Sequence, residues 1–199
     1  MIQATDRASD WRDGFIIVGG RPWLDLLNTT PMIDGVDRDL LRSEDDLRRW
    51  ANAAGLPESA AKNGKGVRKM TALRGTLRTA FDLLRRGKAL PEALMSRVNA
   101  SLADYPLTLR FIAVDGQFRL AANFKADIAG HVARDFAEFA CDFEPERLKA
   151  CHNHECSLLF YDVGKNNKRR WCSMAHCGNR DKVKRYRARQ GGIASSPGS

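Results

Sequence analysis

Four of the five cysteines in this 199-residue chain form two short-spaced pairs near its carboxyl end. Each pair has four residues between its members, and fifteen residues separate Cys151 and Cys156 from Cys172 and Cys177. Two close pairs at this separation can bring four thiolates to one tetrahedral ion, and soft thiolates favour zinc. Because four protein ligands close the coordination shell, the pattern predicts a structural rather than a catalytic zinc.

Three histidines stand beside these cysteines, and the sequence leaves open whether one of them replaces a cysteine as a ligand. His152 and His176 each adjoin a cysteine, and His154 lies two residues from Cys156. An iron–sulfur cluster also fits four cysteines, although the spacing is less typical of one. In the reducing cytoplasm, clustered cysteines indicate metal ligands rather than disulfides. We expect all four cysteines to hold one zinc ion.

The net positive charge of the chain arises in the segment that contains these cysteines. The chain carries 33 Lys and Arg against 24 Asp and Glu, a formal net charge of +9. Residues 1–146 carry 21 side chains of each sign, whereas residues 147–199 carry 12 basic and 3 acidic ones. This asymmetry excludes a uniformly basic protein and indicates an appendage that meets a polyanion.

Two groups of basic side chains within this segment predict contacts with nucleic acid. One group directly precedes Cys172, and the other follows Cys177 on a predicted helix with a single acidic side chain. So many cations close together repel one another unless a polyanion meets them. The candidate contacts are Lys168, Arg169, Arg170, Asn179, Arg180, Lys182, Lys184, Arg185, Arg187 and Arg189. Of these, Asn179, Arg180 and Arg187 are the candidates for base edges, and most of the others for phosphates.

The elements that must position these groups form a compact module. Residues 158–161 are apolar and predict a strand, and the turn-forming residues 164–167 make the middle of the module a hairpin. A helix is predicted over 180–190, with Asn179 as its cap and Gly178 in the left-handed conformation of a tight knuckle. The order knuckle, hairpin, knuckle, helix predicts a small treble-clef-like zinc-binding module. A segment of this size needs the metal because it cannot bury a sufficient core.

The preceding 146 residues predict an α+β domain that is mainly helical and has a small antiparallel sheet. Ser43 before three acidic residues is typical of a helix start, and apolar residues every three or four positions over 67–84 indicate a long amphipathic helix. The period changes to two over 107–124, where Asp115 and Gly116 favour the tight turn of a β-hairpin. Further helices are predicted after Pro22, after Pro91 and over 128–140.

The amino-terminal domain has no Gly-rich phosphate loop, no nucleophile elbow and no His-Glu-x-x-His, so we expect no enzyme. Asp25 and Asn28 are the candidates for a polar pair in a pocket, although both residue types also cap and turn short helices. The charge-free runs are far too short to span a membrane, and residues 1–15 lack a signal-peptide pattern. We therefore expect a cytoplasmic protein.

Two stretches of the sequence resemble known families. The tetrapeptide Cys-Gly-Asn-Arg at residues 177–180 resembles the CGNR zinc finger, together with residues 169–174, the first cysteine pair, and Phe160 and Asp162 between the pairs. Residues 24–29 resemble the LD-x-x-NT signature of the ABATE domain, which precedes this finger in bacterial proteins described as stress-induced transcription regulators. The resemblance implies a DNA-binding carboxyl-terminal finger and an amino-terminal domain that senses a signal or dimerises.

These observations predict a zinc-dependent DNA-binding transcription regulator. We expect an ABATE-like domain over 1–146, a CGNR finger over 147–190 and a disordered tail over 191–199. The expected partner is double-stranded DNA, and a homodimer would suit a small finger that reads few bases. Two alternatives stay open: a structured-RNA-binding protein with the same basic face, and a small-molecule-binding or enzymatic amino-terminal domain that the finger delivers to nucleic acid.

Overall fold

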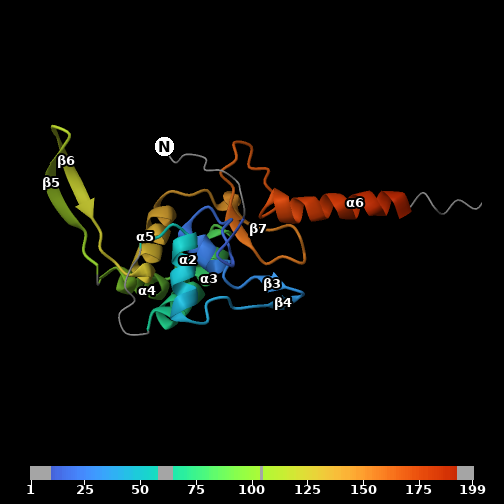
Figure 1. The fold of residues 1–199 in the computed structure, drawn as a ribbon, viewed down its shortest axis with the longest axis horizontal. Coiled ribbons are helices and arrows are strands. Elements are labelled where there is room, and N and C mark those ends of the chain that lie inside the picture. The colour runs from blue at the N-terminus through green and yellow to red at the C-terminus, as the bar shows by residue number, and fades with distance from the viewer. Residues whose placement is uncertain (1–9, 58–64, 104, 192–199) are drawn as a thin grey trace, which may run out of the picture.

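The computed structural model of the chain describes residues 10–57, 65–103 and 105–191, apart from the side chains of residues 123 and 188–191. Figure 1 shows a group of helices in the middle, a long hairpin at one end and a single projecting helix at the other. The helices are α1 (Pro22–Leu27), α2 (Glu44–Ala53), α3 (Gly66–Leu84), α4 (Glu92–Ala103), α5 (Ile128–Cys141) and α6 (Asn179–Gly191). The strands are β1 (Trp11–Arg12), β2 (Phe15–Ile16), β3 (Met32–Ile33), β4 (Val36–Asp37), β5 (Thr108–Val114), β6 (Gln117–Asn123), β7 (Leu148–Ala150) and β8 (Leu159–Tyr161). Short helical turns lie at Pro145–Arg147 and Met174–Gly178.

The described strands pair as two-stranded antiparallel sheets, in the order β1-β2, β3-β4, β5-β6 and β7-β8. The predicted fold class is therefore confirmed: a mainly helical α+β domain with small antiparallel sheets precedes a region in which four cysteines gather. Among the helices of residues 10–57, 65–103 and 105–191, none is both long and apolar enough to span a membrane.

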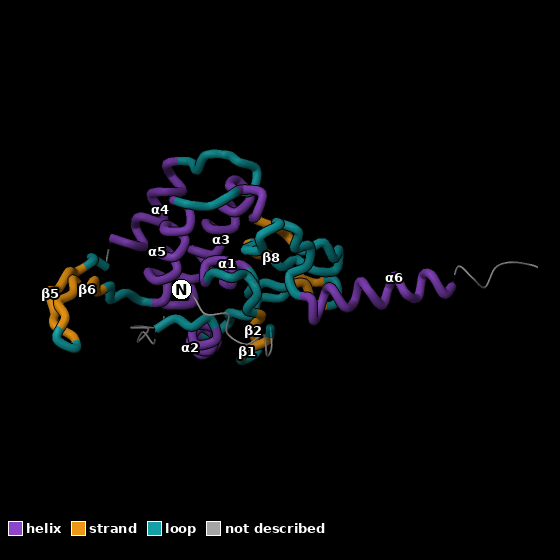
Figure 2. The backbone as a smooth tube through the Cα atoms, turned by 90° about the horizontal axis from the view of Figure 1, so that it is seen from above, coloured by secondary structure: helices purple, strands orange, loops and turns teal. Residues whose placement is uncertain are grey.

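The short helix α1 lies at the centre of the helical body, where it packs against α3 and α5 (Figure 2). Its tryptophan, Trp23, is completely buried. The Trp23 ring contacts the rings of Phe81 on α3 and Phe136 on α5, with centroids 6.3 and 5.3 Å away. A helix of this length is not stable alone, and buried aromatic rings contribute much of the stability of a small core. The surrounding helices therefore hold α1 in place.

Side-chain caps fix two of the helix starts. The Ser43 hydroxyl accepts a hydrogen bond from Asp46 N at 3.1 Å, and α2 begins at the next residue, as predicted. The Asp127 carboxylate accepts one from Gly130 N at 2.8 Å and begins α5. Such caps satisfy amide groups that the first turn of a helix leaves without a partner.

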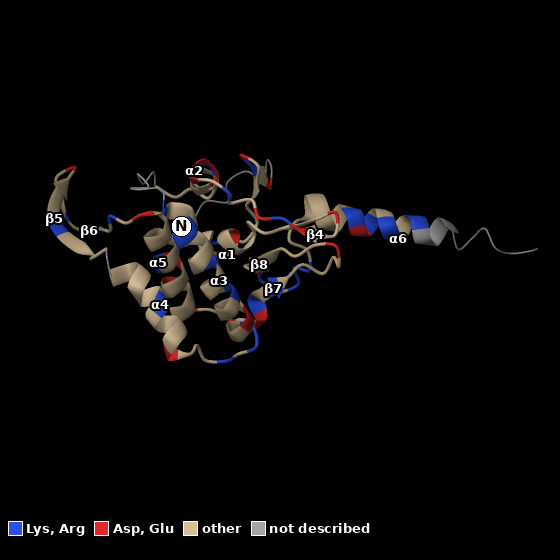
Figure 3. Ribbon diagram, turned by 90° about the horizontal axis from the view of Figure 1, so that it is seen from below, with Lys and Arg blue, Asp and Glu red and all other residues tan. Residues whose placement is uncertain are grey.

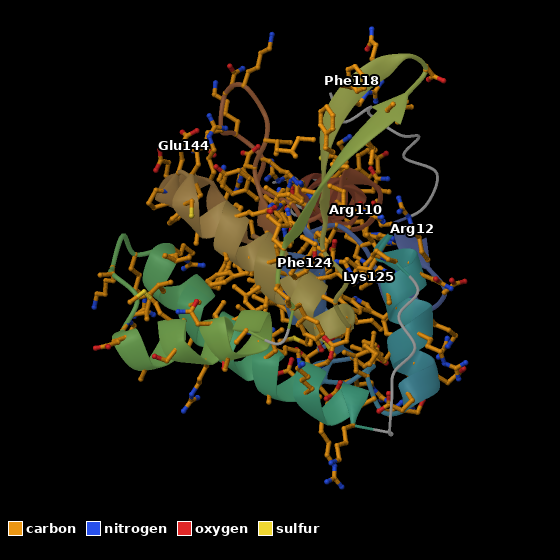
Figure 4. All side chains as sticks on the ribbon, turned by 90° about the vertical axis from the view of Figure 1, so that its left-hand side faces the viewer. Arg12, Arg110, Phe118, Phe124, Lys125 and Glu144 are labelled. Carbon is orange, nitrogen blue, oxygen red and sulfur yellow. The ribbon has the colours of Figure 1, made fainter. Side chains whose placement is uncertain are left out.

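The β5–β6 hairpin forms as predicted. Asp115 and Gly116 take positive φ angles of 50° and 73°, which a tight two-residue turn requires. Phe124, just after β6, anchors the base of the hairpin on α5, where its ring centroid lies 5.4 Å from that of His131. Beyond this base the hairpin projects away from the helices, and the side chains of both its faces are largely exposed (Figure 1, Figure 4).

Between the two cysteine pairs, the predicted hairpin is wrong. The strand β8 pairs with β7, which precedes the first cysteine pair, and Leu148 lies opposite Tyr161. The chain after β8 forms no partner strand because the Asp162 carboxylate accepts hydrogen bonds from Gly164 N at 2.9 Å and Arg169 N at 2.8 Å. The backbone amides of Gly164 and Arg169 thus bond to the Asp162 side chain and not to the backbone of a neighbouring strand. The first cysteine pair therefore lies in the loop of a β7–β8 hairpin.

The second cysteine pair leads into α6, whose start differs from the prediction. Gly178 has no left-handed conformation and ends a π-helical turn. The Ser173 hydroxyl, rather than the Asn179 side chain, caps this turn by accepting a hydrogen bond from Ala175 N at 3.1 Å. The Asn179 amide instead donates to Ala175 O at 3.3 Å. The cause of the difference is that helical geometry already begins at Met174.

Candidate metal centre and nucleic-acid interface

The four predicted zinc ligands lie together between the β7–β8 hairpin and α6. The Sγ atoms of Cys151, Cys156, Cys172 and Cys177 all lie within 4.8 Å of one another. The Cys172 Sγ is 3.7 Å from that of Cys156 and 3.6 Å from that of Cys177. A zinc ion with bonds of about 2.3 Å to four tetrahedral sulfurs sets them about 3.8 Å apart, whereas a disulfide bond is about 2.0 Å long. The four thiols therefore fit one zinc ion and form no disulfide with one another.

Crowding of the thiols explains why a cation is needed at this place. A hydrogen bond with Cys151 raises the pKa of the Cys156 thiol to about 12. Hydrogen bonds with Cys151 and Cys156 also raise the pKa of Cys172, whereas the bond from Cys156 lowers the pKa of Cys151. One thiolate among neutral thiols is thus favoured over four negative charges. A zinc ion supplies the positive charge that lets all four sulfurs ionise.

Neighbouring amides and apolar residues hold the sulfur atoms in place. The Cys172 backbone amide donates to the Cys151 Sγ at 3.4 Å, and the Asn153 side-chain amide donates to the Cys177 Sγ at 3.5 Å. Such donors orient metal ligands and stabilise their charge. The apolar residues buried with the cysteines are Val18, Leu158 and Phe160. Because Val18 precedes α1, the helical body supplies part of the cover over the metal centre.

The three neighbouring histidines lie beside the cysteine cluster rather than in it. Within the part of the chain that the structure describes, the group of side chains close enough to share one ion consists of the four cysteines. The His176 Nε2 lies 3.8 Å from the Asp10 carboxylate, and the His154 Nε2 lies 3.5 Å from the carboxylate of the next residue. His152 packs edge-on against Trp171, with ring centroids 6.1 Å apart. This geometry favours four cysteine ligands.

A groove of about 800 Å³ lies between the loop of the first cysteine pair and α6. The loop contributes His152, the segment before the second pair contributes Trp171, and α6 contributes cations. The basic residues that line the groove are Arg180, Lys184, Arg185 and Arg187. Nucleic-acid sites combine positive charge with aromatic rings, because the charge meets phosphates and the rings stack on bases. The groove thus combines basic side chains with aromatic rings, and the acidic residues Glu155 and Asp181 also line it.

The helix α6 projects from the molecule, and positions of Lys and Arg recur along its ribbon (Figure 3). The exposed candidate contacts on it are Asn179, Arg180, Lys182, Lys184, Arg185 and Arg187. Arg185 forms an ion pair of 2.8 Å with Asp181, the one acidic residue of the helix. Arg189 also belongs to α6, but its side chain lies outside the described residues. α6 thus presents a strongly basic surface.

The basic run before the second cysteine pair, residues 168–170, consists of two exposed residues and one that is partly buried. Lys168 and Arg170 are exposed. The Arg169 guanidinium instead lies 4.1 Å from the centroid of the Phe160 ring. It donates hydrogen bonds to Val18 O at 3.2 Å and to the carbonyl oxygen of Cys172. Arg169 therefore connects the basic run to the metal centre. The donors of its guanidinium that form these bonds are occupied by carbonyl groups of the protein.

Asp25, one of the two candidates for a ligand pocket, is buried and bonds to the backbone. Its carboxylate accepts hydrogen bonds from Val18 N at 3.0 Å and Gly19 N at 2.7 Å. Burial raises the pKa of Asp25 to about 7, although these two amide donors oppose the shift. A Cβ at Gly19 would lie 2.6 Å from the Leu24 Cβ, so the close approach of this loop requires glycine. Asp25 thus fixes the loop that leads to the metal centre.

Asn28, the other candidate, joins the helical body to β8. Its side-chain oxygen accepts a hydrogen bond from Leu159 N at 2.8 Å, and its side-chain amide donates to Leu159 O at 2.9 Å. Tyr161 N, on the same strand, donates to Gly19 O at 3.2 Å. The Asn28 bonds span 131 residues of sequence. Asn28 thus docks the zinc-binding module on the body, whereas Asp25 holds the loop of the body that lies beside it.

Two features of the site were not predicted from the sequence: the groove aromatic Trp171, and the ion pair of the partly buried Lys149 with the buried Asp162. The Lys149 Nζ lies 2.7 Å from the Asp162 carboxylate. Burial would raise the pKa of Asp162, but the hydrogen bonds from Lys149 and from two backbone amides lower it overall. For Trp171, the signal was an aromatic residue directly after three cations. For the ion pair there was none, because a lysine and an aspartate 13 residues apart have no characteristic spacing.

Comparison with known families agrees with this geometry. Residues 147–190 match the family model for the CGNR zinc finger. Residues 20–142 match the model for ABATE, described as "Putative stress-induced transcription regulator". No curated protein matches the chain. The first match and the four clustered cysteines confirm the structural zinc, and the order of the two matches confirms the resemblance. The chain therefore belongs to the ABATE family and carries a CGNR zinc finger after its ABATE domain.

Proposed function

We propose that this protein is a zinc-dependent transcription regulator that binds double-stranded DNA through α6 and the adjoining groove. The observation that carries the proposal is the groove itself, because exposed cations of α6 meet Trp171 and His152 there. In this proposal residues 147–190 form the DNA-binding finger. Residues 1–146 hold the finger in place and respond to a signal.

The zinc ion has a positioning role in the proposal. Cys151, Cys156, Cys172 and Cys177 would hold it, and the ion would fix the β7–β8 loop against the start of α6. In small zinc modules the free energy of metal binding is largely the free energy of folding. The basic side chains of α6 would therefore keep their placement beside the loop only while the metal is bound.

The exposed residues divide into contacts for phosphates and contacts for bases. We assign phosphates to Lys168, Arg170, Lys182, Lys184, Arg185 and Arg189, because Lys and Arg contacts to phosphate supply affinity without sequence information. We assign base edges to Asn179, Arg180 and Arg187, whose side chains can form paired hydrogen bonds with purines. Arg169 is left out, because its guanidinium already bonds to backbone carbonyls of the protein.

Charge reversal in the groove tests the proposal. The double variant Lys184→Glu/Arg187→Glu should weaken binding of the zinc-loaded protein to duplex DNA by at least about tenfold. It should reduce the salt slope by at least about 1, because Lys184 is the one of the two that is assigned to a phosphate. The matched control is Arg86→Glu/Lys88→Glu, which changes the charge equally at two exposed residues after α3. It should change the affinity by less than about twofold. Equal losses in both double variants would contradict a specific role for the groove.

Competition between nucleic acids separates DNA binding from RNA binding. The same basic surface would serve a structured-RNA-binding protein, which would prefer folded RNA to duplex DNA of matched length. We expect duplex DNA to compete better, and selection from random duplexes to enrich a common sequence. A preference for RNA would replace the proposed function by the RNA-binding one.

A further inference from the structure

One face of the β5–β6 hairpin is apolar along its whole length and exposed. Side chains of a strand alternate between the two faces of a sheet. With the observed register, one face carries the six residues that we name the apolar face: Leu109, Phe111, Ala113, Phe118, Leu120 and Ala122. Phe111 and Phe118 are each 73% exposed, and Leu109 and Leu120 are 57% and 67% exposed. The Phe111 and Phe118 rings stack on each other, with centroids 5.3 Å apart.

The opposite face is mixed and carries Arg110, Ile112 and Arg119. An apolar face backed by a polar one is typical of a sheet that packs one side on a core. Among the described residues, the helical body contacts the hairpin at its base, around Phe124, and leaves the apolar face exposed beyond this base (Figure 4). A two-stranded hairpin standing alone is marginally stable at best in water. The apolar face therefore needs a partner surface.

We propose that the apolar face packs against the apolar face of a second copy of this chain, so that two hairpins form the contact of a two-fold dimer. With about 200 Å² for a large apolar side chain, the exposed parts of its two phenylalanines and two leucines amount to about 500 Å² per copy. Two such faces bury about 1,000 Å², the lower bound of a specific interface. The area suits a dimer that forms reversibly.

The charges of the hairpin suit contact between two copies. Arg110 and Arg119 lie on the opposite face, so they point away from the contact and do not repel each other across it. Asp115 lies at the tip, and Lys125 lies just after β6 at the base, both exposed. In a two-fold pair of antiparallel hairpins, the acidic tip of each copy meets the basic base of the other. The hairpin surface is therefore self-complementary both in the placement of its charges and in its apolar character.

The proposed dimer leaves α6 accessible in both copies. The hairpin and α6 lie at opposite ends of the molecule (Figure 1, Figure 2). The dimer would form through the hairpin alone, so it does not require nucleic acid or the nucleic-acid-binding role proposed for α6.

Sedimentation velocity of the full zinc-loaded chain, without nucleic acid and between about 1 and about 100 μM, tests the proposal. We expect monomers at the low end of this range and dimers at the high end. Phe111→Glu should raise the dissociation constant of the dimer at least about tenfold, because it buries a charge without a partner. The matched control Ile112→Glu places the same charge on the opposite face and should change the constant by less than about twofold.

Amide hydrogen exchange over residues 117–123 is a second measurement of dimer formation, and it does not depend on hydrodynamic size. Exchange should slow as the concentration of the wild-type chain rises, and it should be independent of concentration in Phe111→Glu. A monomer over the whole range would overturn the proposal. Equal weakening by Phe111→Glu and Ile112→Glu would also overturn it, because the dimer would then use another surface.

Discussion

The helical body and the zinc-binding module are stabilised in different ways. The body has a continuous apolar core to which α1, α2, α3, α4 and α5 all contribute, with Trp23 among its completely buried residues. The module buries a far smaller cluster, which includes two metal-binding cysteines, and uses polar bonds such as that from Lys149 to Asp162. A core like that of the body can fold without a ligand, whereas a segment as small as the module needs its ion.

The two regions nevertheless share their boundary. Leu148 and Leu159 of the module belong to the core of the body, and Val18 of the body belongs to the cluster around the cysteines. Asp25 and Asn28 stabilise this boundary from the body side by bonding to backbone groups. From this difference we expect the body to tolerate loss of the metal, and the placement of α6 to depend on both the metal and the boundary.

The largest expected effect comes from the metal ligands. Cys177→Ser should abolish zinc binding and unfold the module, a loss on the order of 10 kcal/mol of metal-linked folding free energy. The body should keep its helical circular dichroism. Zinc content by native mass spectrometry and amide exchange over 148–178 measure the two outcomes. Cys141→Ser, at an exposed cysteine outside the cluster, is the control and should change neither. Loss of helicity in the whole chain would remove the distinction between the regions.

The next effect is a pH dependence at the boundary. Because the pKa of Asp25 is raised by burial to about 7, the folded protein binds more protons than the unfolded one between about pH 4 and pH 7. The contribution of Asp25 to the free energy of unfolding is therefore full below about pH 4 and falls as the pH rises to about 7. Relative to Asp25→Asn, wild-type stability should fall by about 4 kcal/mol across this window.

Urea unfolding of both proteins between pH 4 and pH 8 measures this difference. Asparagine keeps an oxygen that can accept the hydrogen bonds of the loop amides, so the variant is a matched neutral form. Asp135 raises and Arg12 lowers the pKa of Asp25, and both stay in place in the comparison. A difference between the two proteins that is independent of pH would show that Asp25 titrates normally.

A smaller effect is expected from the clamp on β8. Asn28→Ala leaves Leu159 N and O buried without their partner, and each such group costs about 1 to 3 kcal/mol, so we expect a loss of about 3 kcal/mol. The control Asn52→Ala, at an exposed asparagine on α2, should cost less than about 0.5 kcal/mol by the usual scale of surface substitutions. Chemical denaturation of the zinc-loaded chains measures both values. Equal stabilities would mean that Asn28 does not dock the module.

The smallest effect is local to the body. Ser43→Ala removes the cap of α2 and should lower the free energy of unfolding by about 1 kcal/mol. Zinc affinity should stay unchanged, because α2 takes no part in the boundary described above. Thermal unfolding and a competitive zinc titration check the two parts of this prediction. A weaker zinc affinity in this variant would show that the regions are coupled more widely than their contacts indicate.

Features with a short-range signal were predictable from the sequence. The start of α2 follows from Ser43, and the turn of the β5–β6 hairpin follows from Asp115 and Gly116, because each depends on local bonds or local φ angles. The cysteine cluster follows from spacing, since two close pairs converge on one ion. Alternation also predicted the strands of the hairpin, but it could not tell that the apolar face is left exposed by the part of the chain that the structure describes.

Features that depend on distant parts of the chain were not predictable. The strand β7 is three residues long, too short for a periodic pattern, so its pairing with β8 had no signal. The role of Asn28 rests on Leu159, 131 residues away. Arg169 belongs to a basic run, and only the contact with Phe160 and the bonds to carbonyl groups separate it from its exposed neighbours.

The most direct test of the link between the metal and the basic surface is the salt dependence of duplex binding, measured for the zinc-loaded chain and again after chelation. If about five of the six assigned cations each neutralise a phosphate, the logarithm of the binding constant should fall against the logarithm of the salt concentration with a slope of about −4 to −5. The chelated chain should bind far more weakly, although its helical body stays folded. A slope near zero, or a slope and affinity that chelation leaves unchanged, would contradict the proposed zinc-dependent DNA binding.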